Sequence, residues 1–431
     1  MDAQQFLAEF GHIANARRGV QQLREMIYQL AITGTLTSQF DTDGDARQLL
    51  SNILALREQL IRRKAYKRLP KLESEALDIP SFIDLPSSWC WTRLLDIGEI
   101  SPRNDAADGA SASFIPMSGF SELHMGRLMP EGEKWGNIKK GFTHFRNGDV
   151  VVAKITPCFE NGKAAVIEGL EHNIGAGTTE LHVFRPIHAD VLPGYIYLFL
   201  RSPYFTVEGE KGMTGTAGQK RLPTDYFATR ALPLPPRAEQ SRIVAKVDEL
   251  MALCDKLEAQ QQGRRKLQNN LRLSTLQAVA SAANPHELQT SWTRLADNFG
   301  RLFHLPEDVA QLRDLILDLA VHGLLVSQSD SDESIAKWLS RVTAKKVDLA
   351  KQKFISKQTA LGDVSEDDYP FPPPMGWAFV RLGQIANKRG GSGNSDKRLS
   401  GNSAQMEMRN MRNRSGADET YQKESHGSIQ G

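Results

Sequence analysis

Apolar residues recur at helical spacing near the start of the chain. Leu23, Ile27 and Leu30 fall at i, i+4 and i+7, which predicts an amphipathic helix with one apolar face. Gly34 is a suitable end for this helix. A second amphipathic pattern covers residues 46–68 and carries a cationic last turn that suits the helix dipole. The chain therefore begins with a helical segment.

Between residues 85 and 236 the pattern changes to short apolar runs. The β-branched run at 148–156 predicts a buried strand, and the Asn161-Gly162 dipeptide after it suits a tight hairpin turn. Residues 180–186 alternate as a half-buried strand, whereas the length of the apolar run at 194–205 favours a helix. Together these elements predict one compact α/β domain.

A long helix follows a proline-rich stop. Pro233, Pro235 and Pro236 are stiff and end the preceding strand, and residues 237–283 contain no further proline. Five apolar residues repeat there at 4-3-4-3 spacing, the pattern of a coiled-coil seam: Ile243, Val247, Leu250, Cys254 and Leu257. This pattern predicts a spacer helix or a dimerising arm.

The opening pattern returns late in the chain. Residues 23–39 and 312–328 are identical at nine of seventeen positions, and a helical pattern around 333–354 follows the second copy. Farther along, Trp89 aligns with Trp377, at an offset of 288 instead of 289. Two blocks in the same order at almost the same offset indicate duplication of a domain-sized unit.

These patterns divide the chain into six parts. They are a helical segment at 1–84, a globular domain at 85–236, a spacer helix at 237–283, a second helical segment with a linker at 284–368, the start of a second globular domain at 369–388, and a tail at 389–431. The tail is rich in Gly, Ser, Asn and charge, which predicts disorder. The fold class expected is α+β or α/β, with an incomplete second unit.

Composition excludes several classes of protein. Hydrophobic residues make up 40% and charged residues 24%, with no apolar run near the roughly 20 residues that span a bilayer, so we expect a cytoplasmic protein without membrane contact. Cys90, Cys158 and Cys254 lie far apart, which argues against a disulfide framework and a cysteine metal site. The net charge of +2 does not identify a partner.

Catalytic motifs are missing from the sequence. Gly162-Lys163 lacks the remaining residues of a phosphate-binding loop, and the histidines show no metal-ligand spacing. Cys158 with His182 as its base is a weaker interpretation than a buried cysteine. The run at 202–205 resembles a methyltransferase loop but lacks its second proline, so a helix end is favoured. We therefore expect a chain that is not an enzyme and binds no metal or cofactor.

The run at 218–258 carries a family resemblance. Its proline segment and the helix "RAEQSRIVAKVDELMALCDKLE" resemble the end of a target-recognition domain and the following helix in type I restriction–modification specificity (S) subunits. "GDVVVAKITPCFENGKAAV" at 148–166 and "GAGTTELHVFRP" at 175–186 resemble segments inside such domains. The likeness covers about residues 15–388.

This resemblance implies a function without catalysis. S subunits hold two recognition domains apart with two long antiparallel helices, and each domain reads one half of a bipartite site in double-stranded DNA. They assemble with two methyltransferase (M) subunits, which bind S-adenosylmethionine, and with restriction (R) subunits, which use ATP and Mg²⁺. A duplicated unit then offers two similar faces to two identical partners.

Site residues follow from the resemblance and from side-chain chemistry. Basic and polar side chains near turns suit contacts with phosphates and base edges. The candidate DNA-binding residues are Lys154, Thr156, Asn161, Lys163, Thr178, Thr179, Gln219, Lys220 and Arg221. The candidate partner-docking residues are Leu23, Ile27 and Leu30 in the opening helix and Ile243, Val247, Leu250, Cys254 and Leu257 in the spacer helix. Each DNA candidate has a structural alternative, because turns, strands and solvated faces use the same residue types.

The second unit stops short of the family pattern. We therefore expect a truncated S subunit whose spacer seam is exposed, with either homodimerisation through that seam or an inactive product as the consequence. A coiled-coil interaction scaffold without DNA binding is the competing interpretation. A methyltransferase or a nuclease ranks third.

Overall fold

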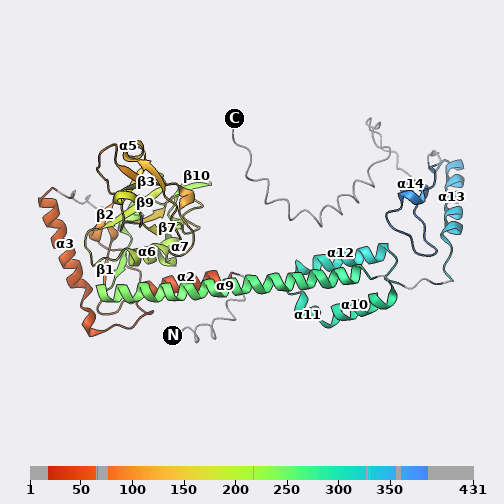
Figure 1. Cartoon of the computed structure of the whole chain (residues 1–431), viewed down its shortest axis with the longest axis horizontal. Helices are drawn as coiled ribbons and strands as arrows, with labels where there is room; N and C mark the ends of the chain where they lie inside the picture. Colours follow the sequence, from red (N-terminus) through yellow and green to blue (C-terminus); the bar gives the residue numbers. More distant parts are fainter. Residues whose placement is uncertain are drawn as a thin grey trace. The chain divides into compact units, whose positions relative to one another are not determined.

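The structure is a computed structural model that describes residues 18–64, 66, 76–216, 218–282, 284–326, 329, 331–355 and 361–386. The tail predicted to be disordered lies outside the described residues. The helix predicted at 46–68 ends earlier, at Arg62, because the chain turns at residues 63–64, where Lys64 has φ +60°. Residues 65, 67 and 68 lie outside the described residues. The chain divides into two compact units, residues 1–270 and 271–431, and Figure 1 shows their elements.

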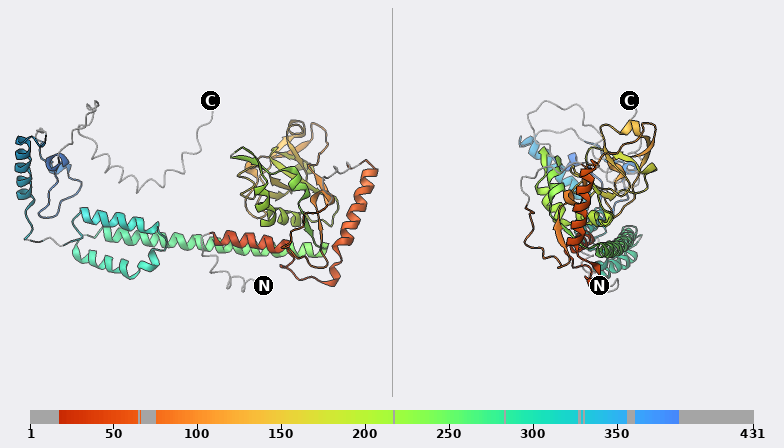
Figure 2. Two further views of the ribbon diagram at one scale, coloured as in Figure 1. Left: turned by 180° about the vertical axis from the view of Figure 1, so that it is seen from behind. Right: turned by 90° about the vertical axis from the view of Figure 1, so that its left-hand side faces the viewer.

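The first unit is built on a pair of helices. The short helix α2 (Gly19–Ile32) lies along the first part of α9 (Arg237–Ala280), as both views in Figures 1 and 2 show. Arg24 of α2 forms ion pairs with Asp255 at 2.6 Å and Glu258 at 2.8 Å on α9. The structure confirms the uninterrupted helix predicted from residue 237, which is 44 residues long.

Two four-stranded sheets form the globular domain. The first has the order β2 (Gly98–Ile100), β9 (Leu181–Pro186), β6 (Val150–Ala153) and β7 (Ala164–Val166), and all its pairs are antiparallel. The second has the order β4 (Glu131–Lys134), β3 (Ser111–Ile115), β8 (Gly175–Gly177) and β5 (Thr143–Phe145), with a parallel pair only at β3–β8. A separate pair, β1 (Cys90–Thr92) and β12 (Leu232–Leu234), closes the domain. The class is mixed α+β.

Shorter elements complete this unit. They are α3 (Ala46–Arg62), α4 (Leu94–Ile97), α5 (Trp135–Ile138), α6 (Pro193–Arg201), α7 (Pro203–Lys211), α8 (Thr224–Thr229), the strands β10 (Thr214–Thr216) and β11 (Gln219–Arg221), and the 3₁₀ turns η1 (Asp41–Asp43), η2 (Met117–Gly119) and η3 (Glu171–Asn173).

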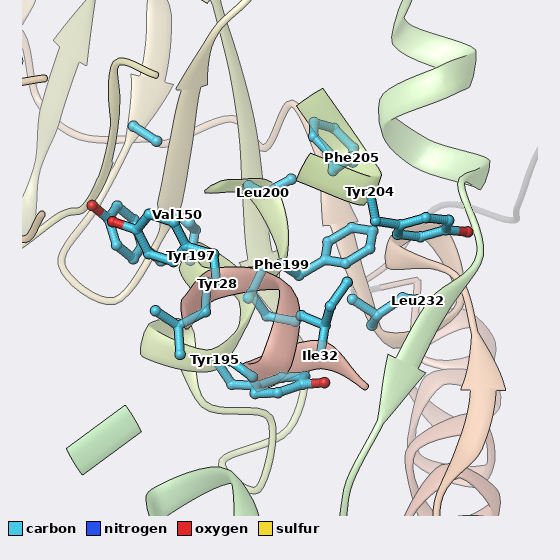
Figure 3. Packing of buried hydrophobic residues seen from close by; sticks show 14 of the residues in the cluster. Tyr28, Ile32, Val150, Tyr195, Tyr197, Phe199, Leu200, Tyr204, Phe205 and Leu232 are labelled. Carbon is cyan, nitrogen blue, oxygen red and sulfur yellow. The ribbon is translucent and has the colours of Figure 1, made fainter. Parts of the chain in front are cut away.

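An aromatic core joins the helices to the sheet. The helix predicted at 194–205 is present, but it is divided into α6 and α7 at Ser202, whose hydroxyl accepts a hydrogen bond from the Phe205 amide. Every residue of α6 from Tyr195 to Leu200 is buried, because α2 covers one side and the sheet covers the other (Figure 3). A short helix that is apolar all round belongs in such a position.

Two local predictions are corrected. Strand β9 is buried on both faces rather than half-buried, because helices and the second sheet cover it from opposite sides. The connection from β6 to β7 runs from residue 154 to residue 163 and is not a tight hairpin. Asn161-Gly162 does form a turn, with Gly162 at φ +72°, but only at the end of this longer loop.

The spacer seam is not exposed, contrary to the prediction. Ile243, Val247 and Cys254 are fully buried, Leu250 is 4% exposed, and Leu257 is partly buried against the same cluster. The cover is α2 together with the globular domain, so a partner helix from elsewhere in the same chain fills the seam. The seam therefore offers no exposed apolar face for homodimerisation.

Burial of the side chains also argues against the docking role predicted for the opening helix. Leu23 and Ile27 are each 1% exposed and belong to the hydrophobic cluster that contains the seam, while Leu30 is half-buried. The apolar stripe of α2 faces inwards because α6, α7 and α9 bury it. Leu23 and Ile27 are therefore core residues and are not available to another subunit, whereas the side chain of Leu30 is partly exposed.

The second unit has its own helical core. It contains the end of α9 together with α10 (Pro285–Asp297), α11 (Phe299–Leu302) and α12 (Asp308–Val321). Leu276, Val279, Leu295, Leu315 and Leu319 are buried in one cluster there. Then follow α13 (Ile335–Lys351), η4 (Glu366–Asp368) and α14 (Leu382–Ile385).

Each of the two units contains a similar close approach of a glycine to a proline. Gly34 has φ +73°, and a Cβ placed there would lie 2.4 Å from Cγ of Pro86. Gly323 has φ +68°, and a Cβ there would lie 2.5 Å from Cγ of Pro374. Both positions therefore require glycine, for backbone conformation and for close approach.

Each unit also contains a similar contact between a cationic side chain and backbone carbonyls at the end of a short helix. In the first unit, the Arg57 guanidinium from α3 donates to the carbonyls of Leu95 and Gly98, around the end of α4. In the second unit, the Lys346 ammonium from α13 donates to the carbonyls of Gly383 at 2.7 Å and Ala386 at 3.0 Å, around the end of α14. A cation suits the carbonyl end of a helix because the helix dipole places partial negative charge there.

Within the described residues, no helix is both long enough and apolar enough to cross a membrane.

Candidate nucleic-acid interface

An exposed hairpin carries three of the predicted DNA-binding residues. Strands β10 and β11 pair antiparallel, with Thr214 opposite Arg221 and Thr216 opposite Gln219, and Gly218 has φ +84° in the turn. Gln219, Lys220 and Arg221 are all exposed. A two-stranded hairpin is marginally stable alone, so its position depends on what anchors it.

Backbone hydrogen bonds anchor this hairpin to the end of β6. The Leu222 amide donates to the Lys154 carbonyl at 2.7 Å, and the Thr156 amide donates to the Lys220 carbonyl at 3.0 Å. The Lys220 amide in turn donates to the Thr156 hydroxyl at 3.1 Å. Lys154 and Thr156 therefore lie beside Lys220, as a common site requires.

The turn before β9 joins the same group. The Lys154 amide donates to the Glu180 carbonyl at 2.9 Å, which places Thr178 and Thr179 near the end of β6. Thr179 is exposed, whereas the Thr178 hydroxyl accepts a hydrogen bond from the Glu180 amide at 3.3 Å and stabilises the turn. Seven of the nine predicted DNA-binding residues thus lie on three neighbouring segments.

The basic residues of this group differ in whether they form an ion pair. Arg221 binds Glu180 through two hydrogen bonds of 2.9 Å, which hold the pKa of the Glu180 carboxyl below its usual range and raise the pKa of Arg221. Lys154 and Lys220 form no ion pair with any residue that the structure describes. The ion pair orients Arg221 and neutralises Glu180, so the net positive charge comes from the two lysines.

Asn161 and Lys163 make structural contacts instead. The Asn161 amide donates to Glu122 at 3.0 Å, and the Lys163 ammonium donates to the Met117 carbonyl at 3.1 Å. Both side chains therefore fasten the loop that begins at η2. The structure does not bring these two side chains into the group around the hairpin.

Sequence reasoning missed residues that border this group. Arg103, His144 and His182 line a polar cavity that also includes Lys154 and Thr179. They come from separate loops and strands, and no spacing or periodicity in the sequence connects them. Only the pairing of the strands brings them together.

The conspicuous "RAEQ" run is a structural anchor. Glu239 is fully buried and accepts hydrogen bonds from the Trp89 indole at 2.7 Å, from Gln39 at 2.6 Å and from Thr37 at 3.2 Å. The adjacent Gln240 accepts from the Leu192 amide and donates to the Asp190 and Pro235 carbonyls. The start of α9 is thereby bound to the globular domain and to the segment after α2.

A second polar contact fixes the domain on the helix pair. His124 lies 3.0 Å from the Tyr28 hydroxyl of α2 and 2.8 Å from the Asp248 carboxylate of α9. Burial lowers the pKa of His124, although Asp248 opposes this effect. The loop that carries His124 therefore connects the globular domain to both helices, α2 and α9.

No group of three or more His, Cys, Asp or Glu side chains is arranged to hold a metal ion among the residues that the structure describes.

Comparison with known proteins identifies the globular domain. Residues 86–264 match the family described as the type I restriction modification DNA specificity domain. The chain is 41% identical over 373 residues to the type I restriction enzyme EcoAI specificity subunit of Escherichia coli, covering 86% of this chain and 63% of that protein. It is also 41% identical over 368 residues to the EcoEI specificity subunit of Escherichia coli, covering 85% of this chain and 62% of that protein.

Among solved structures, the HsdS subunit from Thermoanaerobacter tengcongensis is 20% identical, with a TM-score of 0.30 over 56% of this chain and 51% of that one. The chain spans less than two thirds of the length of the two Escherichia coli relatives. By its sequence, the chain carries a type I restriction modification DNA specificity domain at residues 86–264 and is similar to type I specificity subunits over about 86% of its length.

Proposed function

We propose that this chain is the DNA-binding specificity subunit of a type I restriction–modification complex and recognises one half of a bipartite site. The observation that carries this proposal is the family match at residues 86–264, because the exposed hairpin and the Lys154 group lie inside it. Two unpaired lysines beside exposed polar side chains suit phosphate and base contacts. Binding is assigned to the face that carries β10 and β11.

The chain supplies recognition and no catalysis. Its two Escherichia coli relatives are specificity subunits of restriction enzymes, which supports assembly with methyltransferase and restriction subunits. S-adenosylmethionine would bind to the former, and ATP with Mg²⁺ to the latter. The assembly would act in the cytoplasm, where the chromosomal DNA of a bacterium lies.

The second unit is a partial copy of the first. The matching contacts of Gly34 and Gly323, and of Arg57 and Lys346, support this proposal beyond the sequence repeat. Such a copy would offer a second methyltransferase subunit a surface similar to that of the first. The docking surface must be sought outside the buried stripe of α2 and the buried seam of α9.

Co-purification tests this function. The full chain is expressed with the methyltransferase subunit of the same host, and the complex is examined for binding to genomic DNA fragments in a gel-shift assay. Methylome sequencing of cells with and without the chain then identifies the modified site. A complex that forms but neither binds DNA nor changes methylation would support a protein-interaction scaffold instead.

A further inference from the structure

A polar cavity of about 260 Å³ lies beside the candidate interface. Its walls come from the loop after β2, from β5, from the end of β6, from the start of β9 and from the first residue of α8. Lys154 and Thr179 belong both to this cavity and to the group around the hairpin. None of the residues that line it is acidic, so the cavity suits an anion.

Two cations at this cavity have no carboxylate partner. Arg103 and Lys154 take part in no ion pair with any residue that the structure describes. The nearby carboxylate of Glu180 is already bound by Arg221 through both of its oxygens. The charge of Lys154 is therefore left to face the cavity and solvent.

The hydrogen bonds of His144 explain why Arg103 has donors to spare. The Asn104 amide must donate to Nδ1 of His144, 3.2 Å away, and the Lys139 carbonyl must accept from Nε2, 2.9 Å away. Nε2 therefore carries the proton and cannot accept from Arg103. The remaining contact of the guanidinium is the Phe142 carbonyl at 3.3 Å, which uses one of its five N–H groups.

The two histidines contribute polar surface without charge. His182 is 2% exposed, its Nε2 lies 2.9 Å from the Leu222 carbonyl, and burial lowers its pKa to about 4. Burial also lowers the pKa of His144. The positive charge of the cavity at neutral pH thus comes from Arg103 and Lys154, and hydroxyl groups come from Thr143, Thr179 and Thr224.

We propose that this cavity binds one phosphodiester group of the DNA backbone, with Arg103 and Lys154 supplying the charge and the threonine hydroxyls supplying further donors. Arg103 is the stronger anchor, because a guanidinium can donate to two phosphate oxygens at once. The inference rests on the proposed function, since it names how the same face would hold DNA. It adds Arg103 to the DNA-binding residues and makes Lys154 a phosphate contact.

Salt-dependent DNA binding tests this site. The full chain, in its methyltransferase complex where one is obtained, is titrated with a fluorescent random-sequence duplex at several salt concentrations. We expect the double variant Arg103→Gln/Lys154→Gln to bind about tenfold more weakly and to reduce the slope of log affinity against log salt by about 1, the effect of one lost phosphate contact. The control variant Arg62→Gln, which removes a guanidinium from the exposed end of α3, should keep the affinity and slope of the wild type.

The outcomes separate the site from the function. If the wild type binds the duplex and the double variant matches it in affinity and slope, the phosphate site is refuted and the proposed function stands. If the wild type binds no duplex in any form, both are refuted. Inorganic phosphate at constant ionic strength should compete with the duplex for the wild type; calorimetric phosphate binding that displaces no DNA would reveal a free-anion site instead.

Discussion

Single buried polar residues hold this molecule together at defined points, and Glu239 is the clearest case. Its carboxylate accepts three hydrogen bonds from side chains of two distant segments. We expect Glu239→Ala to destabilise the first unit by about 3 kcal/mol, because the buried Trp89 indole would lose its acceptor. Chemical denaturation measures this. Glu249→Ala on the same helix, which breaks only an exposed pair with Lys246, should change the stability by less than about 0.5 kcal/mol.

His182 makes the stability of the first unit depend on pH. Its folded-state pKa, about 4, lies below the usual value of 6.5, so the unfolded chain binds more protons between these two values. Stability should therefore fall as the pH is lowered from 6.5 to 4, by on the order of 3 kcal/mol from this residue alone. Denaturation curves at several pH values should show a shallower decline for His182→Gln. The exposed His172, changed to Asn, should leave the decline as it is in the wild type.

For single residues, the sequence predicts which candidates lie together better than it predicts what each side chain contacts. Lys154, Thr156 and Lys220 were predicted as one group and lie together, because each flanks a strand end or a turn. Asn161 and Lys163 are near the same strands in sequence, yet their side chains bind Glu122 and the Met117 carbonyl. The direction of a loop side chain depends on tertiary neighbours that no local pattern encodes.

Among the elements, helical periodicity was a reliable guide and the identity of packing partners was not. The pattern from Ile243 to Leu257 predicts a helix that needs a partner along one stripe, which the structure confirms. A seam pattern does not say which segment covers it. The cover is α2 of the same chain, so a face that resembled a dimer interface is part of the core.

The two related helices α2 and α12 allow a matched test of burial. Ile27 and Ile316 occupy the same position of the repeat, but Ile27 is 1% exposed and Ile316 is 36% exposed. We expect Ile27→Ala to cost about 3 kcal/mol through lost burial and a residual cavity, and Ile316→Ala to cost about 1 kcal/mol or less. Denaturant titration of the full-length variants measures both. Equal losses would contradict the different burial of the two helices.

For the whole molecule, two separate hydrophobic cores imply two cooperative units. Ile27 belongs to a cluster whose members all lie within residues 1–270, and Leu319 belongs to one that lies within residues 271–431. Each core can lose its packing without exposing the other, so we expect two thermal transitions in calorimetry of the full chain.

Variants in each core assign these transitions. Ile27→Ala should lower the midpoint of one transition only, and Leu319→Ala, at a residue 2% exposed, should lower only the other. Cooperative folding of the whole chain would instead produce a single transition that both variants shift. That result would mean that α9, the continuous helix shared by the units, transmits the loss of one core to the other. A destabilising change in the globular domain would then also destabilise the second unit, through this helix. Two independent transitions would instead restrict the effect of such a change to the first unit.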